Sequence, residues 1–499
     1  MKISDTEDRD RNLSNDPRKA RGQIVFVTII FVALFAVMLT WTAWYSWDRR
    51  EFLFNEQHNG RDTLQEERVT RGTIYANDGR TILAQTMEEG GHTYRYYPYG
   101  REYAHAVGYS VLGGAGVESA CKYDLLHTGI SVPEQMELDQ RLERYPGNNV
   151  ITTLDPALQD AVVEALDYYG YEKAAVIVTD PATGKILAMV SRPDYDPNNI
   201  EEDWDRFVNA DQEEGEDTGI LLNRVTQGRY PPGSTFKIVD AVELLQEDPN
   251  AINSYSFDCE GSWTYDGETV KCYHGETHGE VDLTEAFADS CNSAFSQIGV
   301  QQIDRSRFMS TLDKLMFNRK LPYDLPCETS YVELDENTGT ESMIQISIGQ
   351  GTTVMTPLHM NMLTCAIANG GVLMEPYIID SVTDSSNTAI KSYKPTAYGS
   401  LMSADVAANL TAMMQEVCRT GTAYRMKDTP YYVAGKTGSA EFGSNLESSQ
   451  TYYDSHAWFT AFAWDDSRRI CLTVVLEEEG TGSVAVPVAR RIFDAYFLE

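Results

Sequence analysis

The chain has 499 residues and a formal net charge of −35 at pH 7. This length allows two or three domains, each with a full hydrophobic core. The strong negative charge argues against nucleic acid as a partner, because phosphate backbones bind to basic surfaces.

A polar tail and an apolar segment begin the chain. Residues 1–23 are rich in Asp, Arg and Asn and predict a disordered tail. Residues 24–46 carry no charge, and as a helix they would be ~34 Å long, enough to span a bilayer core. A cleavable signal peptide has a shorter apolar region, and the Trp and Tyr residues at the end of this segment are typical of a membrane interface. We expect an uncleaved membrane anchor, and the basic residues of the tail favour a cytoplasmic N-terminus.

The segment 47–149 predicts a small β-rich domain next to the membrane. Asn77-Asp78-Gly79 is typical of a tight turn between short strands, and Gly90-Gly91 indicates a second turn. Pro and Gly within residues 145–149 mark the end of this domain. We expect a membrane-proximal pedestal or dimerisation domain over 47–149 and a catalytic domain over 150–499.

The rest of the chain predicts an α+β fold. Two apolar stretches, 174–178 and 185–190, are joined by a turn sequence and predict a hairpin. The middle, residues 220–420, is rich in helical patterns. This order predicts an antiparallel sheet, flanked by helices, whose strands come from both ends of the domain. Near the C-terminus, strand patterns cover 431–434, 456–464 and 469–477, and a helical pattern covers 486–497.

The first motif whose residues could take part in catalysis is Ser234-Thr235-Phe236-Lys237, which follows a Pro-Pro-Gly sequence that would break a helix. Apolar residues recur at helical spacing after it, so we expect Ser234 on the first turn of a buried helix. Ser234 and Lys237 are three residues apart, and their side chains would share one helix face. A serine nucleophile needs an adjacent base, and a buried lysine can supply one when its neutral form is accessible. The structural alternative is a helix-start serine beside a surface lysine.

The second motif, Ser290-Cys291-Asn292, lies between predicted helices at 283–288 and 294–303. A turn there would present Ser290 and Asn292 on the same side. A hydroxyl can relay a proton to a leaving group, and an amide can bind a peptide backbone. Helix capping is the alternative function of these residues.

The third motif, Lys436-Thr437-Gly438-Ser439, follows a predicted strand. Gly438 permits an extended peptide to lie against the edge of that strand. Lys436 can hold a terminal carboxylate, and Thr437 or Ser439 can add hydroxyl contacts. The backbone N–H groups of Ser439 and Ser234 could together form an oxyanion hole.

The eight cysteines do not form a dense disulfide framework. Cys259 and Cys272 flank a predicted hairpin tip, and an exported location would permit a disulfide between them. With His274 and His278 they also resemble a metal site, although the close ligand pairs typical of structural zinc are missing apart from the two histidines. A disulfide, free thiols and zinc stay open, and we predict no metal among the catalytic residues and no cofactor.

The three motifs, in this order, resemble those of class B penicillin-binding proteins, which are peptidoglycan D,D-transpeptidases. The compact pedestal resembles the short subtype of that class and leaves no room for the glycosyltransferase domain of bifunctional relatives. Other stretches that resemble the family are 71–74, 79–84, 104–109, 223–226, Gly349-Gln350-Gly351, 354–357, 368–371 and His456-Ala457-Trp458-Phe459.

The resemblance implies a role for each motif residue. Ser234 would be acylated, with Lys237 as its base and Ser290 as a proton shuttle. Asn292 would orient the donor peptide, and Lys436, with the threonine after it, would grip the terminal carboxylate of that peptide. In such a reaction the serine expels the last D-Ala of a stem peptide, and an amine of a neighbouring stem peptide then resolves the acyl-enzyme into a crosslink.

The resemblance also implies partners and a location. It implies peptidoglycan stem peptides as substrates, β-lactams as inhibitors, a separate membrane glycan polymerase as partner, and a catalytic domain outside the cytoplasm of a bacterial cell. The alternatives are a β-lactamase-like hydrolase, a D,D-carboxypeptidase and an inactive cell-wall scaffold. Glu333 and Asn337 have the spacing of a hydrolytic loop, but their distance from Ser290 along the chain disfavours a β-lactamase. The intact set of serines and lysines disfavours the scaffold, and the pedestal disfavours the carboxypeptidase.

Overall fold

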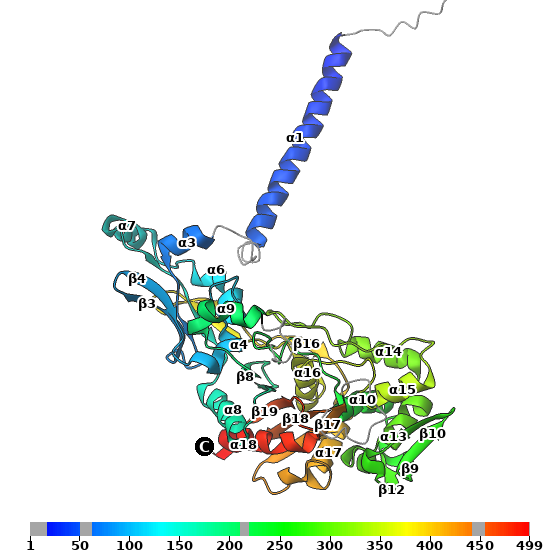
Figure 1. The fold of residues 1–499 in the computed structure, drawn as a ribbon. Coiled ribbons are helices and arrows are strands. Elements are labelled where there is room, and N and C mark those ends of the chain that lie inside the picture. The colour runs from blue at the N-terminus through cyan, green and yellow to red at the C-terminus, as the bar shows by residue number, and fades with distance from the viewer. Residues whose placement is uncertain (1–16, 50–61, 210–218, 442–454, 499) are drawn as a thin grey trace, which may run out of the picture. The chain divides into compact units, whose positions relative to one another are not determined.

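The computed structural model describes residues 17–49, 62–209, 219–441 and 455–498. The chain divides into two units, residues 1–61 and 62–499 (Figure 1). The first unit contains helix α1 (Pro17–Asp48), which begins inside the segment expected to be a tail. Within the described residues, α1 is the one helix long and apolar enough to cross a membrane, because an 18-residue window within Arg21–Asp48 has a mean hydropathy of 2.8. Residues 1–16 of the expected tail lie outside the described residues.

The core of the second unit is an antiparallel sheet in the order β17-β18-β19-β7-β8 among the described residues. Two of its strands precede the helical middle of the chain and three follow it, which confirms the predicted fold. Every residue of β7 is buried, which explains its uninterrupted apolar sequence. The strands are β7 (Ala174–Thr179), β8 (Ile186–Arg192), β17 (Tyr432–Glu441), β18 (Ser455–Trp464) and β19 (Arg469–Leu476).

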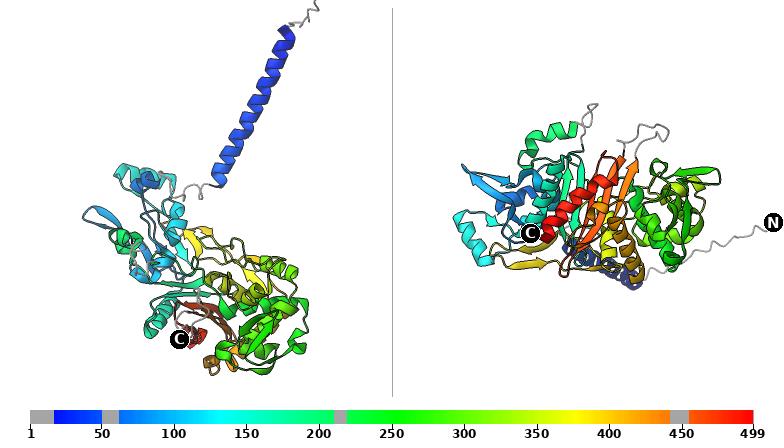
Figure 2. Two further views of the ribbon diagram at one scale, coloured as in Figure 1. Left: turned by 45° about the vertical axis from the view of Figure 1, so that its right-hand side comes forward. Right: turned by 90° about the horizontal axis from the view of Figure 1, so that it is seen from below.

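Helices cover both faces of this sheet. α8 (Pro156–Tyr169) and α18 (Ala485–Leu498) pack together on one face, and the red α18 crosses the orange strands in the right-hand view of Figure 2. α16 (Pro357–Ala368) lies against the opposite face, between the sheet and the helical region, and all of its residues are buried. Thr364 of α16 meets Thr460 of β18 with 2.6 Å between their hydroxyl oxygens, so even the buried polar groups of this layer are paired.

The helical region contains a small β lobe. The predicted hairpin tip is confirmed as a turn between β10 (Ser262–Tyr265) and β11 (Glu268–Lys271), and β12 (Gly279–Asp282) pairs with β9 (Ser256–Cys259). Helices of this region are α10 (Lys237–Glu247), α11 (Ala251–Ser254), α12 (Leu283–Ala288), α13 (Asn292–Gln297), α14 (Arg305–Lys314), α15 (Thr340–Ser347) and α17 (Ala404–Arg419).

A second sheet has the order β15-β14-β6-β2-β3-β4 among the described residues. The predicted turns at 77–79 and 90–91 connect β2 to β3 and β3 to β4. β6 crosses the expected domain boundary at 149 and 150, and β14 and β15 come from much later in the chain, so this sheet uses both expected domains. The strands are β2 (Ile74–Tyr75), β3 (Ile82–Glu89), β4 (His92–Tyr96), β6 (Asn149–Thr152), β14 (Ile379–Thr383) and β15 (Ala389–Ser392).

Short elements complete the unit. The helices are α3 (Asp62–Arg68), α4 (Ala104–Val107), α5 (Gly116–Ala120), α6 (Lys122–Leu125), α7 (Val132–Arg141) and α9 (Ile200–Asn209). The strands are β1 (Val69–Thr70), β5 (Tyr145–Pro146), β13 (Val372–Met374) and β16 (Ala397–Ser400).

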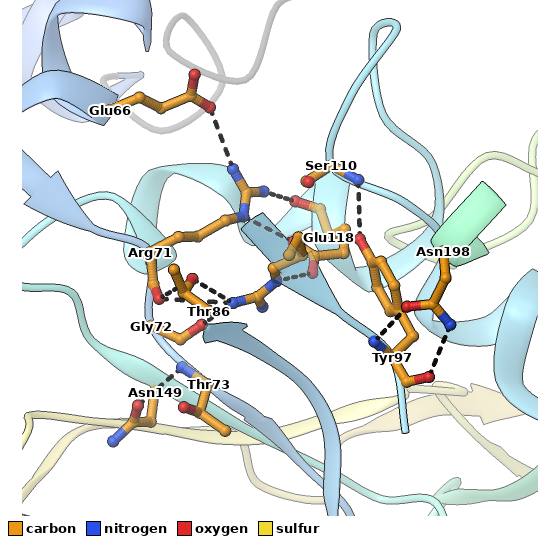
Figure 3. A network of polar contacts seen from close by, with 11 residues as sticks. Glu66, Arg71, Gly72, Thr73, Thr86, Tyr97, Ser110, Glu118, Asn149 and Asn198 are labelled. Atoms are coloured by element: carbon orange, nitrogen blue, oxygen red, sulfur yellow. Dashed lines mark hydrogen bonds and ion pairs between the residues drawn. The ribbon is translucent and has the colours of Figure 1, made fainter. Parts of the chain in front are cut away.

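A buried ion network holds the N-terminal part of this unit together (Figure 3). The Glu118 carboxylate, on α5, accepts hydrogen bonds from Arg71 at 2.7 Å and from Arg95, on β4, at 2.6 Å. Arg95 also donates to the carbonyl of Gly72 at 2.7 Å. Burial alone would raise the pKa of Glu118, but Arg95 and Arg71 outweigh it and hold the pKa below its ordinary value. The charged form of Glu118 therefore links α5, β4 and the segment that leads into β2.

Candidate active site

Ser234 lies in a short 3-10 helix, η4 (Gly233–Phe236), that leads directly into α10. The first turn of the predicted helix is thus a 3-10 turn, in which side chains three residues apart lie one above the other. Lys237, the first residue of α10, places its Nζ 3.1 Å from the Ser234 Oγ. The predicted contact between these two side chains is therefore present in the structure.

Lys237 is fully buried and is the centre of the polar contacts in this site. Its Nζ lies 2.6 Å from the Ser290 carbonyl oxygen, 3.2 Å from the Ser290 Oγ and 2.8 Å from the Asn292 Oδ1. Burial lowers the pKa of Lys237 to about 8. About a tenth of this amine is neutral at pH 7, far more than for an exposed lysine, and the neutral amine can accept a proton.

The second motif forms the turn between α12 and α13. Ser290 has a φ of +59°, a left-handed conformation that is costly for a residue with a side chain and is often found at functional sites. Cys291 caps α13, because its Sγ accepts a hydrogen bond from the Ala294 N–H at 3.4 Å. The helix therefore begins at Asn292, two residues before the predicted start.

The third motif brings a second buried lysine to the same hydroxyl. The Lys436 Nζ, on β17, lies 3.0 Å from the Ser290 Oγ and 3.0 Å from the Thr437 carbonyl oxygen. Burial lowers the pKa of Lys436 well below its ordinary value, and the nearby Lys237 lowers it further. Because the Ser290 hydroxyl lies between two buried amines, it is placed to pass a proton from one to the other.

The two hydroxyls of the third motif contact residues outside the motifs. The Thr437 Oγ1 lies 2.5 Å from the Thr422 Oγ1, and the Ser439 Oγ accepts a hydrogen bond from the Gly482 N–H at 3.0 Å. The Gln350 Nε2 lies 3.5 Å from the Ser439 carbonyl oxygen. Gln350 belongs to a stretch with family resemblance, whereas nothing in the local sequence marks Thr422.

β17 is an edge strand of its sheet, and its backbone lies directly against η4. A Cβ added at Gly438 would lie 2.7 Å from the Pro232 carbonyl oxygen, and one added at Gly233 would lie 2.3 Å from the Ser439 carbonyl oxygen. Glycine is therefore required on both sides of this contact. The close approach places the backbone of Ser439 next to the turn that carries the predicted nucleophile.

The predicted site residues thus occupy one locality. Ser234, Lys237, Ser290, Asn292 and Lys436 form a continuous set of hydrogen bonds. Thr437 and Ser439 extend this set along β17. This arrangement can carry out acyl transfer through a serine, with a neutral lysine as base and a hydroxyl as relay.

The structure also locates two other features that the sequence left open. Glu333, the candidate hydrolytic glutamate, is exposed, and no hydrogen bond among the described residues joins it to Ser234. Cys259 and Cys272 are free thiols with their Sγ atoms 3.6 Å apart, so the disulfide is not present in the structure.

Comparison with known proteins places these observations in a family. The sequence model described as "Penicillin binding protein transpeptidase domain" matches residues 174–494. The peptidoglycan D,D-transpeptidase PbpA of Mycolicibacterium smegmatis is 30% identical over 465 residues, which are 89% of this chain and 92% of the relative. MrdA of Haemophilus influenzae, also a peptidoglycan D,D-transpeptidase, is 28% identical over 87% of this chain and 73% of the relative.

Solved structures give the same result for the fold. Penicillin-binding protein A from M. tuberculosis, in an imipenem acyl-enzyme complex, has a TM-score of 0.76 and 28% identity, covering 87% of this chain and 100% of the other. The D,D-transpeptidase domain of a peptidoglycan glycosyltransferase from Eggerthella lenta has a TM-score of 0.72 and 28% identity, with 87% and 100% covered.

Proposed function

This chain belongs to the penicillin-binding protein transpeptidase family, as a class B peptidoglycan D,D-transpeptidase, and we propose that Ser234 is its nucleophile and Lys237 the base. The enzyme acts on peptidoglycan and is acylated by β-lactams. The observation that carries the assignment of the base is the contact of 3.1 Å between the Lys237 Nζ and the Ser234 Oγ. A fully buried amine with a pKa of about 8 can take the hydroxyl proton as the serine attacks.

Proton transfer in the reaction follows the hydrogen bonds of the site. Neutral Lys237 accepts the Ser234 proton while the Ser234 Oγ bonds to the penultimate D-Ala carbonyl carbon of the donor peptide. The Ser290 hydroxyl, 3.2 Å from Lys237 and 3.0 Å from Lys436, relays a proton to the nitrogen of the departing D-Ala. An amine of an acceptor stem peptide then attacks the ester, loses its proton along the same path and restores Ser234.

Substrate contacts are assigned to the remaining motif residues. Asn292 orients the donor peptide through its amide group, and Lys436 with Thr437 holds the terminal carboxylate of that peptide. The hydroxyl of Ser439 adds a contact. The backbone N–H groups of Ser234 and Ser439 form the oxyanion hole, which the close approach of η4 and β17 supports.

A fluorescent penicillin tests the two catalytic assignments. The full chain in detergent is incubated with the label, beside Ser234→Ala, Lys237→Ala and a control, Lys314→Ala, which removes an exposed lysine at the end of α14. We expect a stable adduct on the parent and the control and none on the two catalytic variants, all with parental circular dichroism. Labelling of Ser234→Ala at the parental rate would contradict the assignment of the nucleophile, and rapid release of the label by the parent would indicate a β-lactamase.

The membrane arrangement is a further part of the proposal. We assign residues 1–23 to the cytoplasm, 24–46 to a single span of the bacterial cell membrane, 47–149 to the pedestal and 150–499 to the transpeptidase domain outside the cytoplasm. The apolar helix and the basic residues before it support this topology. A membrane-impermeant maleimide tests it in intact cells: Ser386→Cys, at an exposed site, should be labelled, and Ser14→Cys should not. Labelling of Ser14→Cys but not of Ser386→Cys would contradict the assigned orientation and would place the N-terminus outside the cell.

We also infer a membrane glycan polymerase as partner, because the family model matches a transpeptidase domain over residues 174–494, and a transpeptidase crosslinks glycan chains that another activity must make. The span at 24–46 is the docking surface available to such a partner within the bilayer. Replacing this span by an unrelated apolar helix should abolish co-purification with the polymerase and preserve penicillin binding. Unchanged co-purification would exclude the span as the contact.

A further inference from the structure

Three thiols and one imidazole converge beside the second motif. Cys259, Cys272, His278 and Cys291 each offer one ligand atom, and these atoms all lie within 4.8 Å of one another. The three cysteines are buried and the histidine is partly buried. We refer to these four residues as the Cys3His cluster.

Three of the distances within the Cys3His cluster are close to the edge lengths of a tetrahedral metal site. The Cys259 Sγ lies 3.6 Å from the Cys272 Sγ and 3.3 Å from the His278 Nδ1, and the Cys272 Sγ lies 3.7 Å from the Cys291 Sγ. A tetrahedron with Zn–S bonds of about 2.3 Å has edges of about 3.8 Å, and Zn–N bonds of about 2.0 Å shorten the edges to nitrogen. A disulfide would use only two of the three thiols and would leave the third thiol and the imidazole beside it.

The fold builds this cluster from four separate points of the chain. Cys259 ends β9, Cys272 follows β11, and His278 precedes β12, where Gly279 pairs directly with Cys259. Cys291 comes from the second motif. His274, which sequence spacing suggested as a ligand, is exposed and lies outside the cluster. The chain turns at this residue with a φ of +52°.

We propose that Cys259, Cys272, His278 and Cys291 bind one Zn²⁺ ion in a structural site. Three thiolates and one imidazole are a common ligand set of structural zinc, and four protein ligands leave no position for water or substrate. We choose zinc because thiolate and imidazole are its usual protein ligands, and the proposed catalytic mechanism needs no metal.

The zinc would attach the β lobe to the catalytic turn. Cys291 lies between Ser290 and Asn292 and caps α13, and the Asn292 Nδ2 already donates to the carbonyl of Lys271 at 3.2 Å, one residue before Cys272. An ion bound to both Cys272 and Cys291 would fix the position of the turn. Zinc binding itself does not depend on the catalytic roles assigned above, whereas its effect on acylation rests on the proposed function.

Metal analysis of the full chain tests the site directly. The protein is purified in detergent through a tag that binds no metal, dialysed against metal-free buffer and analysed by mass spectrometry of the elements. We expect about one zinc per chain, and less than about a tenth of that in Cys272→Ser. The matched control is Cys327→Ser, which removes a partly exposed thiol outside the cluster and should keep the zinc.

Two further measurements do not depend on the stability of a serine variant. His278→Cys preserves four ligands and should retain about one zinc per chain. Replacement of zinc by Co²⁺ in the parent should produce the visible absorption bands of a tetrahedral thiolate site. A parent chain that holds no zinc, and that after unfolding has six rather than eight reactive thiols, would overturn the proposal in favour of a disulfide.

The effect on the catalytic turn is measured separately. After zinc is removed with a chelator, acylation by fluorescent penicillin should be roughly tenfold slower, and added zinc should restore it. An unchanged rate in demonstrably zinc-free protein would refute the coupling to the second motif. Failure of the proposed function would look different, since Ser234→Ala would then still be labelled although zinc remained bound.

Discussion

Two buried lysines contact the Ser290 hydroxyl, and in the proposed mechanism their protonation state controls the reaction. The Ser290 Oγ lies 3.2 Å from the Lys237 Nζ and 3.0 Å from the Lys436 Nζ. Two ammonium groups that contact the same hydroxyl oxygen would repel each other in a medium of low dielectric constant. The lowered pKa values of both lysines therefore favour a state with at most one of the two charged.

The pH dependence of acylation follows from Lys237. Only its neutral form can accept the Ser234 proton, and burial lowers its pKa to about 8. The acylation rate should therefore rise about tenfold per pH unit below 8 and level off above it. Stopped-time labelling with fluorescent penicillin between about pH 6 and pH 10 measures this profile. A rate that does not change across this range would exclude Lys237 as the base.

Motif spacing predicted which residues with reactive or charged side chains would meet in the candidate site. It could not predict the residues that come close to this site only through the fold. Ser234 and Lys237 meet because they are three residues apart on one turn. Thr422, which follows the end of α17, contacts Thr437, and no sequence pattern marks Thr422 as a site residue. Cys291 lies between the two polar residues of its motif, and its contact with Cys272 depends on the folded β lobe.

The helices and strands predicted from long local patterns are present in the structure. Short strands that pair with distant parts of the chain were not predicted. The hairpin of β7 and β8 and the final helix α18 have long apolar patterns. β6, by contrast, is a short strand whose partners include β14, more than 200 residues later. Local sequence contains no signal for such pairing, so the predicted boundary at 149 and 150 falls within a strand of the second sheet.

The ion network around Glu118 gives a prediction about the stability of the second sheet. Glu118→Gln would leave Arg71 and Arg95 buried without their shared charge, and we expect a loss of about 3–5 kcal/mol in the free energy of unfolding. Urea titration of the full chain in detergent measures this loss. The control is Glu137→Gln, since Glu137 pairs with Arg141 on the surface and should change stability by less than about 1 kcal/mol.

The pH dependence of this contribution has a definite sign. The pKa of Glu118 in the folded protein lies below its ordinary value, so the ion network stabilises the protein at neutral pH and is lost as the pH falls through that lowered pKa. The difference between the parent and Glu118→Gln should therefore narrow in acid. A constant difference down to strongly acidic pH would show that charge is not the source of the stabilisation.

The contact between β17 and η4 gives a second prediction for the elements. In Gly438→Ala the new Cβ would lie 2.7 Å from the Pro232 carbonyl oxygen, so the strand must move away from the turn that carries Ser234. We expect a loss of about 1–3 kcal/mol in stability and a much larger loss in acylation rate. In the control, Gly339→Ala, nothing lies within 4 Å of the new Cβ, and both quantities should match the parent. Full acylation by Gly438→Ala would show that the close approach is not needed.

At the scale of the whole molecule, the central sheet is closed by segments far apart in the chain. β7 and β8 precede the helical middle, β17, β18 and β19 follow it, and α18 packs beside α8 over one face of the completed sheet. A chain made in this order cannot finish its core before its last helix is present. The anchor, in contrast, belongs to a separate unit.

Two deletions therefore should have opposite effects. Removing residues 1–47 should yield a soluble protein that fluorescent penicillin acylates within about twofold of the parental rate, because the core of the second unit is left intact. Removing residues 485–499 eliminates buried side chains that include Val488, Ile492 and Phe493 and uncovers one face of the sheet. At about 1.5–3 kcal/mol for each large side chain that is no longer buried, the loss is comparable to the whole net stability of an ordinary domain, about 5–15 kcal/mol. We expect an aggregated product without penicillin binding, and a folded, labelled product would show that α18 is dispensable for closing the sheet.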